Sequence, residues 1–416
     1  MSSRGSGTGP NKTPSPPRAT VSAPTAGRGN VPVSSASRPP PATTLPLRTT
    51  PPPAAPAATG TKRPASRSPS PDTDQIRGLR IMYHTDARDR FSIPEVPRTS
   101  ATYQTTLFCI YLAFEMLDSQ KGRAALLNTA TQVLSVNPRS KKTWAVTVNK
   151  EVVDAAWITG FLNGMRDDFP NLLLSTRVSD LGVTRRFHWF KGPGSTWKPK
   201  EAGLLFLDSR MMDYAADSVS RAATSSTPAN VADYENHLLM ASITIAHEMV
   251  HFLVGRIVGV PDNDTPSKVN SPPNLNTDTG ESGRFWEVQF FGRLINAYQT
   301  DGNNDPRQGG TLWAEIKPST GAAARTAQVP QALVKAILAR NFSDLPMARV
   351  TDIKRPATAK TVRALGPVAA NDYFDTATDF DRAFDKMRTL TTSTLSGRDW
   401  VRVTSINTTP NNVRVA

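Results

Sequence analysis

The chain has 416 residues, a formal net charge of +14 and a single cysteine, Cys109. The length allows two or three domains, and one cysteine excludes an intramolecular disulfide and any zinc site built from cysteines. The charge is uneven, because residues 1–71 carry nine basic and no acidic residues while the remainder carries 40 basic and 35 acidic ones. The later part is therefore only mildly basic and does not favour a nucleic-acid-binding fold.

Residues 1–72 form a tail rich in Pro, Ser, Thr and Ala. The tail holds 17 of the 35 prolines and no aromatic residue, so it cannot bury enough apolar surface to offset its ordering entropy. We expect it to be disordered. Arg38–Pro41 and Pro51–Pro53 fit partners of the SH3 or WW type, although a plain solvated tail is the favoured interpretation. A weaker alternative is that the basic tail binds nucleic acid.

The sequence predicts a soluble protein of the cytoplasm or nucleus. Its first 17 residues contain no apolar segment of the kind found in a secretory signal. No uninterrupted apolar run reaches the roughly 18 residues needed to span a bilayer, so no membrane partner is expected. Cys109 lies within the apolar run Leu107–Phe114, which favours a core residue over a nucleophile.

Residues 73–416 have the patterns of one mixed α+β domain. Period-two patterns predict strands at Leu79–His84, Trp144–Val148, Leu172–Val178, Arg185–Phe190, Leu204–Leu207 and Leu312–Ile316. Helical patterns predict helices at Tyr103–Leu117, Lys121–Val136, Glu151–Phe169 (with Val152 toward the core), from 231–233 to 255–260, Ser282–Tyr298, Val329–Arg340 and Phe374–Leu390. Small polar residues at Asp217–Asn230 predict a surface loop or weak helix.

The central predicted helix carries the motif His247-Glu248-Met249-Val250-His251. Histidines four residues apart lie on one helical face, one turn above the other, where their rings can share one metal ion. The rest of Leu238–Gly255 is apolar or small, which is typical of a buried helix. Two histidines and a glutamate in such a helix need a partner, because an unpaired buried charge is costly. The motif therefore predicts a metal site with Glu248 beside it.

A catalytic zinc ion needs a third protein ligand. No histidine follows His251, so a third histidine would have to come from upstream, from His84, His188 or His237. A downstream carboxylate is the more natural choice. Glu287 shares a predicted helical face with Phe290, Phe291, Leu294 and Tyr298 and is the favoured ligand.

Other assignments remain open for the acids near that helix. Glu281, at its start, is the rival third ligand or a hydrogen-bond acceptor that orients a histidine. Asp278 is a further candidate ligand. If no metal binds, Glu287 would instead form an ion pair with Arg284 or Arg293.

Two histidines on one helix and a glutamate from a later helix resemble the gluzincin group of zincin-type zinc metallopeptidases. The resemblance covers about 204–298. It implies a zincin-like domain with a buried active-site helix and a small mixed or antiparallel sheet. Within it, Leu204–Asp208 would border the cleft and pair with the extended substrate. Many gluzincins carry an acid four residues after the ligand glutamate, and here that position is Phe291.

The resemblance further implies zinc-dependent hydrolysis of a peptide or protein substrate. His247, His251 and Glu287 would hold Zn²⁺, and Glu248 would activate the zinc-bound water as general base. Tyr214, Tyr298 and His188 are the candidates for stabilising the oxyanion. The alternative is a non-catalytic interaction or regulatory protein with a structural or degenerate zinc site, which would need a fourth protein ligand.

Overall fold

The computed structural model describes residues 76–84, 93–136, 143–178, 180–259, 265–266, 268–270, 280–299, 307–316, 325–347 and 360–361. All of them fall within one compact unit, Ser66–Ala416. The helices are α1 (Ala101–Asp118), α2 (Gln120–Val136), α3 (Ala145–Val148), α4 (Ala155–Asp167), α5 (Pro199–Ala202), α6 (Ser209–Thr224), α7 (Pro228–Val258), α8 (Ser282–Phe291) and α9 (Gln331–Leu338). The strands are β1 (Ile81–His84), β2 (Asn171–Ser175), β3 (Gly182–Arg186), β4 (Gly203–Asp208), β5 (Leu294–Gln299), β6 (Thr311–Ile316), β7 (Arg325–Gln328) and β8 (Lys360–Thr361).

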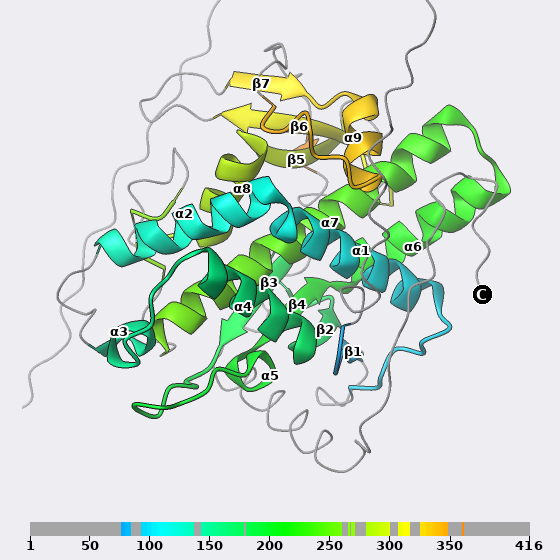
Figure 1. Cartoon of the computed structure of the whole chain (residues 1–416). Coiled ribbons are helices and arrows are strands. Elements are labelled where there is room, and N and C mark those ends of the chain that lie inside the picture. Colours follow the sequence, from blue (N-terminus) through cyan, green and yellow to red (C-terminus); the bar gives the residue numbers. More distant parts are fainter. Residues whose placement is uncertain are drawn as a thin grey trace, which may run out of the picture. The chain divides into compact units, whose positions relative to one another are not determined.

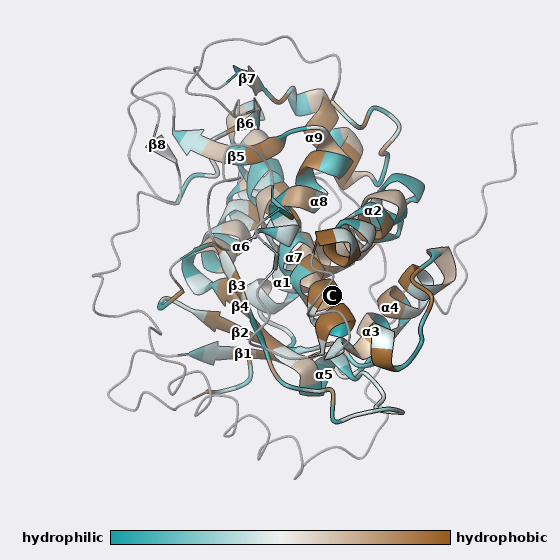
Figure 2. Cartoon of the chain, turned by 90° about the vertical axis from the view of Figure 1, so that its left-hand side faces the viewer, coloured by the Kyte–Doolittle hydropathy of each residue, from teal (hydrophilic) through white to brown (hydrophobic). Residues whose placement is uncertain are grey.

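The first sheet is mixed, with strand order β1-β2-β4-β3. β1, β2 and β4 are parallel, and β3 pairs with β4 in the antiparallel direction. Every residue of β2 and β4 is buried, and Figure 2 shows their strong hydrophobic colour. Continuous apolar runs are typical of parallel strands covered on both faces. Among the described strands, β3 is the edge strand beside α7.

Helix α7 is the core of the described structure, and it contacts α1, α6, α8, α9 and β3 (Figure 1). Thr227 caps its start by accepting a hydrogen bond from the Asn230 backbone N–H, and Pro228 occupies the first turn. Gly259 ends the helix in the left-handed conformation at φ 85°. The helix is long and apolar enough to cross a membrane, but 83% of its most apolar window is buried inside the protein. It is therefore the interior helix that the sequence predicts, and a core of this kind fits a soluble protein.

The second sheet is antiparallel, with strand order β7-β6-β5-β8. The predicted helix Ser282–Tyr298 is wrong in its second half, because α8 ends at Phe291 and β5 follows. Gly292 causes the break: it adopts a left-handed φ of 81°, and its N–H bonds to the Val288 carbonyl. Leu294 and Tyr298 therefore belong to a strand and share no helical face with Glu287.

Two local predictions also differ from the structure, and a third, the loop or weak helix at Asp217–Asn230, is confirmed in part. The predicted strand Trp144–Val148 is a helical turn, whose bonds run back to Trp144 and Ala145. Val152 is 75% exposed, because α4 begins only at Ala155, after the cap Asp154. Asp217–Asn230 contains the end of α6 and the start of α7.

The strand β4 also differs from its expected role. The resemblance implied that Leu204–Asp208 pairs with a substrate, but β4 is hydrogen-bonded on both sides, to β2 and to β3. A strand with both edges occupied cannot accept a further strand. The predicted strand Arg185–Phe190 is wrong for most of its length, because β3 ends at Arg186. The remaining predicted helices and strands within the described residues are confirmed, with ends shifted by a few residues. The tail 1–72 and the predicted helix Phe374–Leu390 lie outside the described residues.

The accessibility of the Cys109 thiol provides a test of how this core is packed. The side chain is fully buried in α1, and its thiol faces the Leu238 carbonyl of α7 at 3.7 Å. Burial raises the pKa of the thiol to about 12, so we expect it to stay protonated and unreactive in the folded protein up to strongly alkaline pH. A thiol reagent such as DTNB should label no cysteine at pH 8 until denaturant unfolds the chain. Rapid labelling of folded protein would contradict the packing of α1 on α7.

Candidate metal centre

The motif residues lie on consecutive turns of α7, as the sequence predicts. The rings of His247 and His251 are 5.2 Å apart between centroids. One donor atom from each of His247, Glu248 and His251 lies within 4.8 Å of the others. Glu248 is buried, whereas the two histidines are partly exposed. The Nε2 edges of the two imidazole rings form the side of the cluster that faces away from the interior of α7.

Glu281, the residue directly before α8, lies next to the Nε2 atoms of both histidines. Its Oε2 atom is 3.2 Å from His247 Nε2 and 3.4 Å from His251 Nε2. The same oxygen is buried and makes no hydrogen bond of acceptable geometry. One carboxylate oxygen and two imidazole nitrogens therefore converge on a single point, which is the geometry a third ligand would have.

The other ring nitrogens of the two histidines are held by α8 residues. His247 Nδ1 is 2.6 Å from Glu287 Oε1, and His251 Nδ1 is 3.2 Å from Ser282 Oγ. A carboxylate oxygen in this position accepts a hydrogen bond from Nδ1–H, whereas a hydroxyl group can accept from or donate to the ring nitrogen. Because a carboxylate can only accept, the Glu287 contact assigns a proton to Nδ1 of His247 and directs its Nε2 atom toward Glu281. The Ser282 hydroxyl can donate to or accept from His251 Nδ1, so it orients that ring in either tautomer.

The convergence of these donor atoms fits a cation. With neutral imidazoles whose Nε2 atoms carry lone pairs, the two nitrogens and the carboxylate oxygen would repel one another unless a positive charge lay between them. Nitrogen and oxygen donors of this kind suit zinc. The set His247, His251 and Glu281 can therefore hold a divalent metal ion, with Glu287 and Ser282 orienting the two rings.

Both glutamates named from the sequence thus lie at the histidine pair, on opposite sides of the His247 ring. Glu287 is buried, as predicted from its apolar helical neighbours, but it contacts the nitrogen that faces away from Glu281. The arrangement favours Glu281 as the third ligand and Glu287 as the orienting acid. The ligand assignment from sequence, His247, His251 and Glu287, itself stays a prediction.

Within the site, the charges of the histidines and glutamates shift one another's pKa values. Burial alone would lower the pKa of His247, but Glu281 and Glu287 raise that pKa well above its usual value. Burial would raise the pKa of Glu281, yet the two histidines hold it well below its usual range. Without a metal ion, a proton on His247 therefore serves as the balancing positive charge.

Glu248 differs from the other two acids. Burial raises its pKa, and the nearby His247 and His251 only partly oppose that effect. Its Oε1 atom is 4.0 Å from His247 Nε2, close to the point where the donors converge. A carboxylate with a raised pKa beside a metal site is suited to accept a proton at neutral pH.

Two glycines allow the start of α8 to approach α7. A Cβ atom on Gly283 would lie 2.3 Å from the His247 ring, and one on Gly280 would lie 2.0 Å from the Pro266 carbonyl oxygen. Two backbone bonds fix the same segment: Gly280 N donates to Thr265 O and Glu281 N donates to Val269 O, both at 2.8 Å. The sequence Gly280-Glu281-Ser282-Gly283 therefore sets the position of Glu281.

The edge strand β3 borders Glu248. Thr184 Oγ1 donates a hydrogen bond of 2.9 Å to the Glu248 backbone carbonyl. Two residues earlier on the same face, a Cβ atom on Gly182 would lie 3.0 Å from Glu248 Cγ and 2.8 Å from Thr244 Cγ2. β3 thus holds the main chain of the motif and leaves room for the Glu248 side chain.

The other sequence candidates lie apart from this centre. Tyr298 is buried and donates to Glu315, His188 is exposed, and Tyr214 is only half-buried; none has a contact with the histidine pair among the described residues. His84 contacts Ser175 and His237 contacts the Arg307 carbonyl, so neither completes the site. Asp278 lies outside the described residues.

Sequence reasoning missed Ser282, Gly283, Gly182 and Thr184. Paired glycines around Glu281 were the available signal, since glycine is selected where a backbone approaches another group closely. The group approached, the His247 ring, becomes visible only in the folded structure. No local pattern marks Gly182 or Thr184.

No family model matches the sequence, and no curated protein or solved structure matches it. The functional inference therefore depends on the geometry of the centre.

Gly283→Ala tests the packing of α8 against α7. The new methyl group cannot fit against the His247 ring, so we expect a loss of roughly 1–3 kcal/mol in unfolding free energy, as for an overpacked core. Gly160→Ala in α4 is the matched control, because its Cβ meets nothing closer than 3.9 Å and should be neutral or stabilising. Denaturant unfolding measures both, and equal stability of the two variants would contradict the described contact.

Proposed function

We propose that the chain is a zinc metallopeptidase of the gluzincin type, with His247, His251 and Glu281 as the protein ligands of zinc. The observation that carries the proposal is the convergence of two Nε2 atoms and the unpaired Glu281 Oε2 at 3.2 and 3.4 Å. In this assignment Glu287 takes the orienting role that gluzincins give to an acid shortly after the ligand glutamate. The departure noted at Phe291 then has an explanation, because the orienting acid is six residues after Glu281 instead of four.

A zinc ion held by His247, His251 and Glu281 would supply a Lewis acid that polarises a carbonyl group and makes water more acidic. Glu248, whose Oε1 lies 4.0 Å from His247 Nε2, would act as the general base that takes a proton from water and returns it to the leaving amine. Thr184 and Gly182 hold Glu248 in place from β3. Glu287 and Ser282 keep the His247 and His251 rings from rotating.

The sheet topology supports a peptide as substrate. β3 is the antiparallel edge strand and lies directly beside Glu248, so an extended peptide along its outer edge would pass the proposed centre. Main-chain pairing of this kind is a common way to bind a peptide. In this proposal β3 takes the substrate-bordering role that the resemblance assigned to Leu204–Asp208. The cytoplasm or nucleus remains the predicted location, and an SH3 or WW partner of the tail remains a prediction.

Glu248→Gln separates catalysis from metal binding. We expect this variant to keep stoichiometric zinc and to lose about 10²–10⁴-fold in turnover of a peptide substrate, because the amide cannot accept the proton. His247→Ala should lose the zinc itself. Metal analysis of the purified protein and a peptide-cleavage assay measure the two effects.

The same variant tests the non-catalytic alternative. If Glu248 were the fourth ligand of a closed structural site, Glu248→Gln would weaken zinc binding as well. A wild-type protein with tightly bound zinc and no hydrolytic activity toward any peptide in a broad library would favour that alternative.

The roles proposed for Glu281 and Glu287 predict different losses of zinc affinity when each residue is replaced. Removing an orienting acid typically weakens metal binding 10–100-fold, so Glu287→Ala should fall within that range. Glu281→Ala should weaken it further, because a direct ligand is lost. Competition with a chromophoric chelator measures the zinc dissociation constant of each variant. A larger loss of zinc affinity in Glu287→Ala than in Glu281→Ala would return the ligand role to Glu287.

A further inference from the structure

A second polar cavity lies at the N-terminal half of α7. Its volume is about 620 Å³, within the range of small-molecule sites. Its walls come from α6, α7, α9, the loop 307–310 and the strands β5 to β7. Asn236, which lines it, precedes His247 by eleven residues, or roughly 16 Å along the helix axis. The cavity is therefore distinct from the candidate metal centre.

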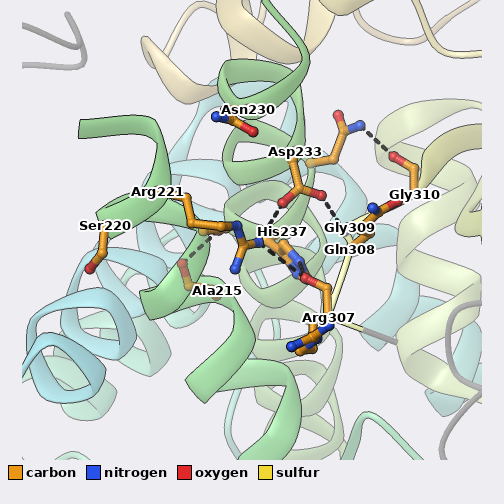
Figure 3. Close-up of polar contacts among 12 residues, drawn as sticks. Ala215, Ser220, Arg221, Asn230, Asp233, His237, Arg307, Gln308, Gly309 and Gly310 are labelled. Atoms are coloured by element: carbon orange, nitrogen blue, oxygen red, sulfur yellow. Dashed lines mark hydrogen bonds and ion pairs between the residues drawn. The ribbon is translucent and has the colours of Figure 1, made fainter. Parts of the chain in front are cut away.

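The charged side chains of the lining are engaged within the protein (Figure 3). Asp233 forms a 2.8 Å ion pair with Arg221 of α6 and accepts a 2.6 Å hydrogen bond from Gly309 N. Arg221 also donates to the Arg307 carbonyl at 3.2 Å, and the Arg307 residue has a further partner within the protein. These contacts hold the loop 307–310 against α6 and α7. Among the described residues, the cavity therefore offers a ligand no unpaired charge.

Four carboxamide side chains of the lining already use their NH₂ groups as donors, at 2.6 to 3.0 Å. The pairs are Asn230 with Ser225 O, Asn236 with Gly310 O, Gln299 with Gln308 O, and Gln331 with Glu235 Oε2. Each partner is a carbonyl or carboxylate oxygen, which can only accept, so the contact fixes which end of each amide is the nitrogen. The amide oxygens of Asn230, Asn236 and Gln331 remain for a ligand.

The amide oxygen of Asn236 shows most clearly what kind of group the cavity lacks. The Asn236 side chain lines the cavity and the residue is only 6% exposed. Its Oδ1 atom is buried and has no hydrogen-bond partner among the described residues, although unpaired buried acceptors are rare and costly. A ligand that brings a hydrogen-bond donor to this atom would remove that cost.

The lining therefore favours a neutral ligand with several donors. Its polar groups come from α7, α9, β5, β7 and the loop 307–310, so they suit a ligand whose donors point in several directions. No aromatic side chain occurs in the described part of the lining, which leaves a flat nucleobase nothing to stack on. Hydroxyl groups meet these conditions, because each can donate to an amide oxygen and accept from the second N–H of a neighbouring amide.

We infer that this cavity binds a neutral polyhydroxyl compound, a sugar or a sugar alcohol. One hydroxyl group donates to Asn236 Oδ1, and others donate to the amide oxygens of Asn230 and Gln331. The carbon skeleton contacts the apolar side chains of the lining, which are Ala229, Ala232, Leu312 and Val329. This inference stands independently of the proposed peptidase activity.

Titration of the full chain, followed by NMR or calorimetry, tests the inference with two kinds of probe. The methyl glycosides of glucose, galactose and mannose are the ring-shaped probes, and glucitol and mannitol are the open-chain probes. At least one should bind saturably and one-to-one at millimolar concentration, and the two kinds show whether a sugar or a sugar alcohol is preferred.

Charged forms of the tightest-binding probe test the neutrality of the site. When its terminal CH₂OH group is changed to a carboxylate or to an aminomethyl group, we expect about tenfold weaker binding. The reason is that a charge entering the cavity loses hydration and finds no unpaired charge of opposite sign. Tighter binding of either charged form would overturn the inference.

Variants locate the bound probe. Asn230→Ala removes one amide oxygen at a half-buried position and should weaken binding about three- to tenfold, the effect of one lost hydrogen bond. Ala232→Phe places a ring in the cavity and should abolish binding. Ala223→Phe, at an exposed alanine of α6 outside the lining, is the matched control and should leave binding unchanged.

Circular dichroism shows whether each variant is folded, and Asn230→Ala decides the question if Ala232→Phe is not. No saturable binding of any of the probes at millimolar concentration would overturn the inference. Unchanged affinity in Asn230→Ala, or equal affinity of folded Ala232→Phe and Ala223→Phe, would overturn it as well.

Discussion

Two imidazoles on adjacent turns of a buried helix present four ring nitrogens that must each find a partner. In this protein α8 and the residue before it face all four: Glu287 and Ser282 contact the Nδ1 atoms, and Glu281 Oε2 lies 3.2 and 3.4 Å from the Nε2 atoms. The position of α8 against α7 is therefore determined by polar groups as well as by apolar packing. A cation, or a proton on His247, completes the balance of charge.

Much of this arrangement is local in the sequence and was predictable from it. The spacing of His247 and His251 fixes their common face on any helix, and the apolar residues around them predict a buried one. The burial of Glu287 followed from its apolar neighbours. Its partner did not, because which nitrogen it meets depends on where α8 begins and how closely α8 approaches α7. That distance is set by Gly283, whose contact with the His247 ring is tertiary.

The helices and strands that were predicted incorrectly also depend on contacts that lie outside the local sequence. The predicted helix through Tyr298 continued an apolar period that α8 and β5 share by coincidence, and it overlooked Gly292 as a helix end. Trp144–Val148 was too short for alternation to separate a strand from a helical turn. β4 was expected to border the cleft from its position in the sequence, whereas the antiparallel insertion of β3 beside it depends on sheet topology. Long, strongly periodic segments such as α1, α2 and α7 were predicted well because their own residues determine them.

The backbone bonds of Gly280 to Thr265 and of Glu281 to Val269 have an evolutionary consequence. They tie together the two ends of the stretch between residues 270 and 280, immediately before Glu281. The place of Glu281 beside the histidines is thus fixed by main-chain bonds, which any side chain at Thr265 or Val269 could supply. The selective constraint at these two positions therefore falls on backbone geometry and packing more than on the identity of a polar group.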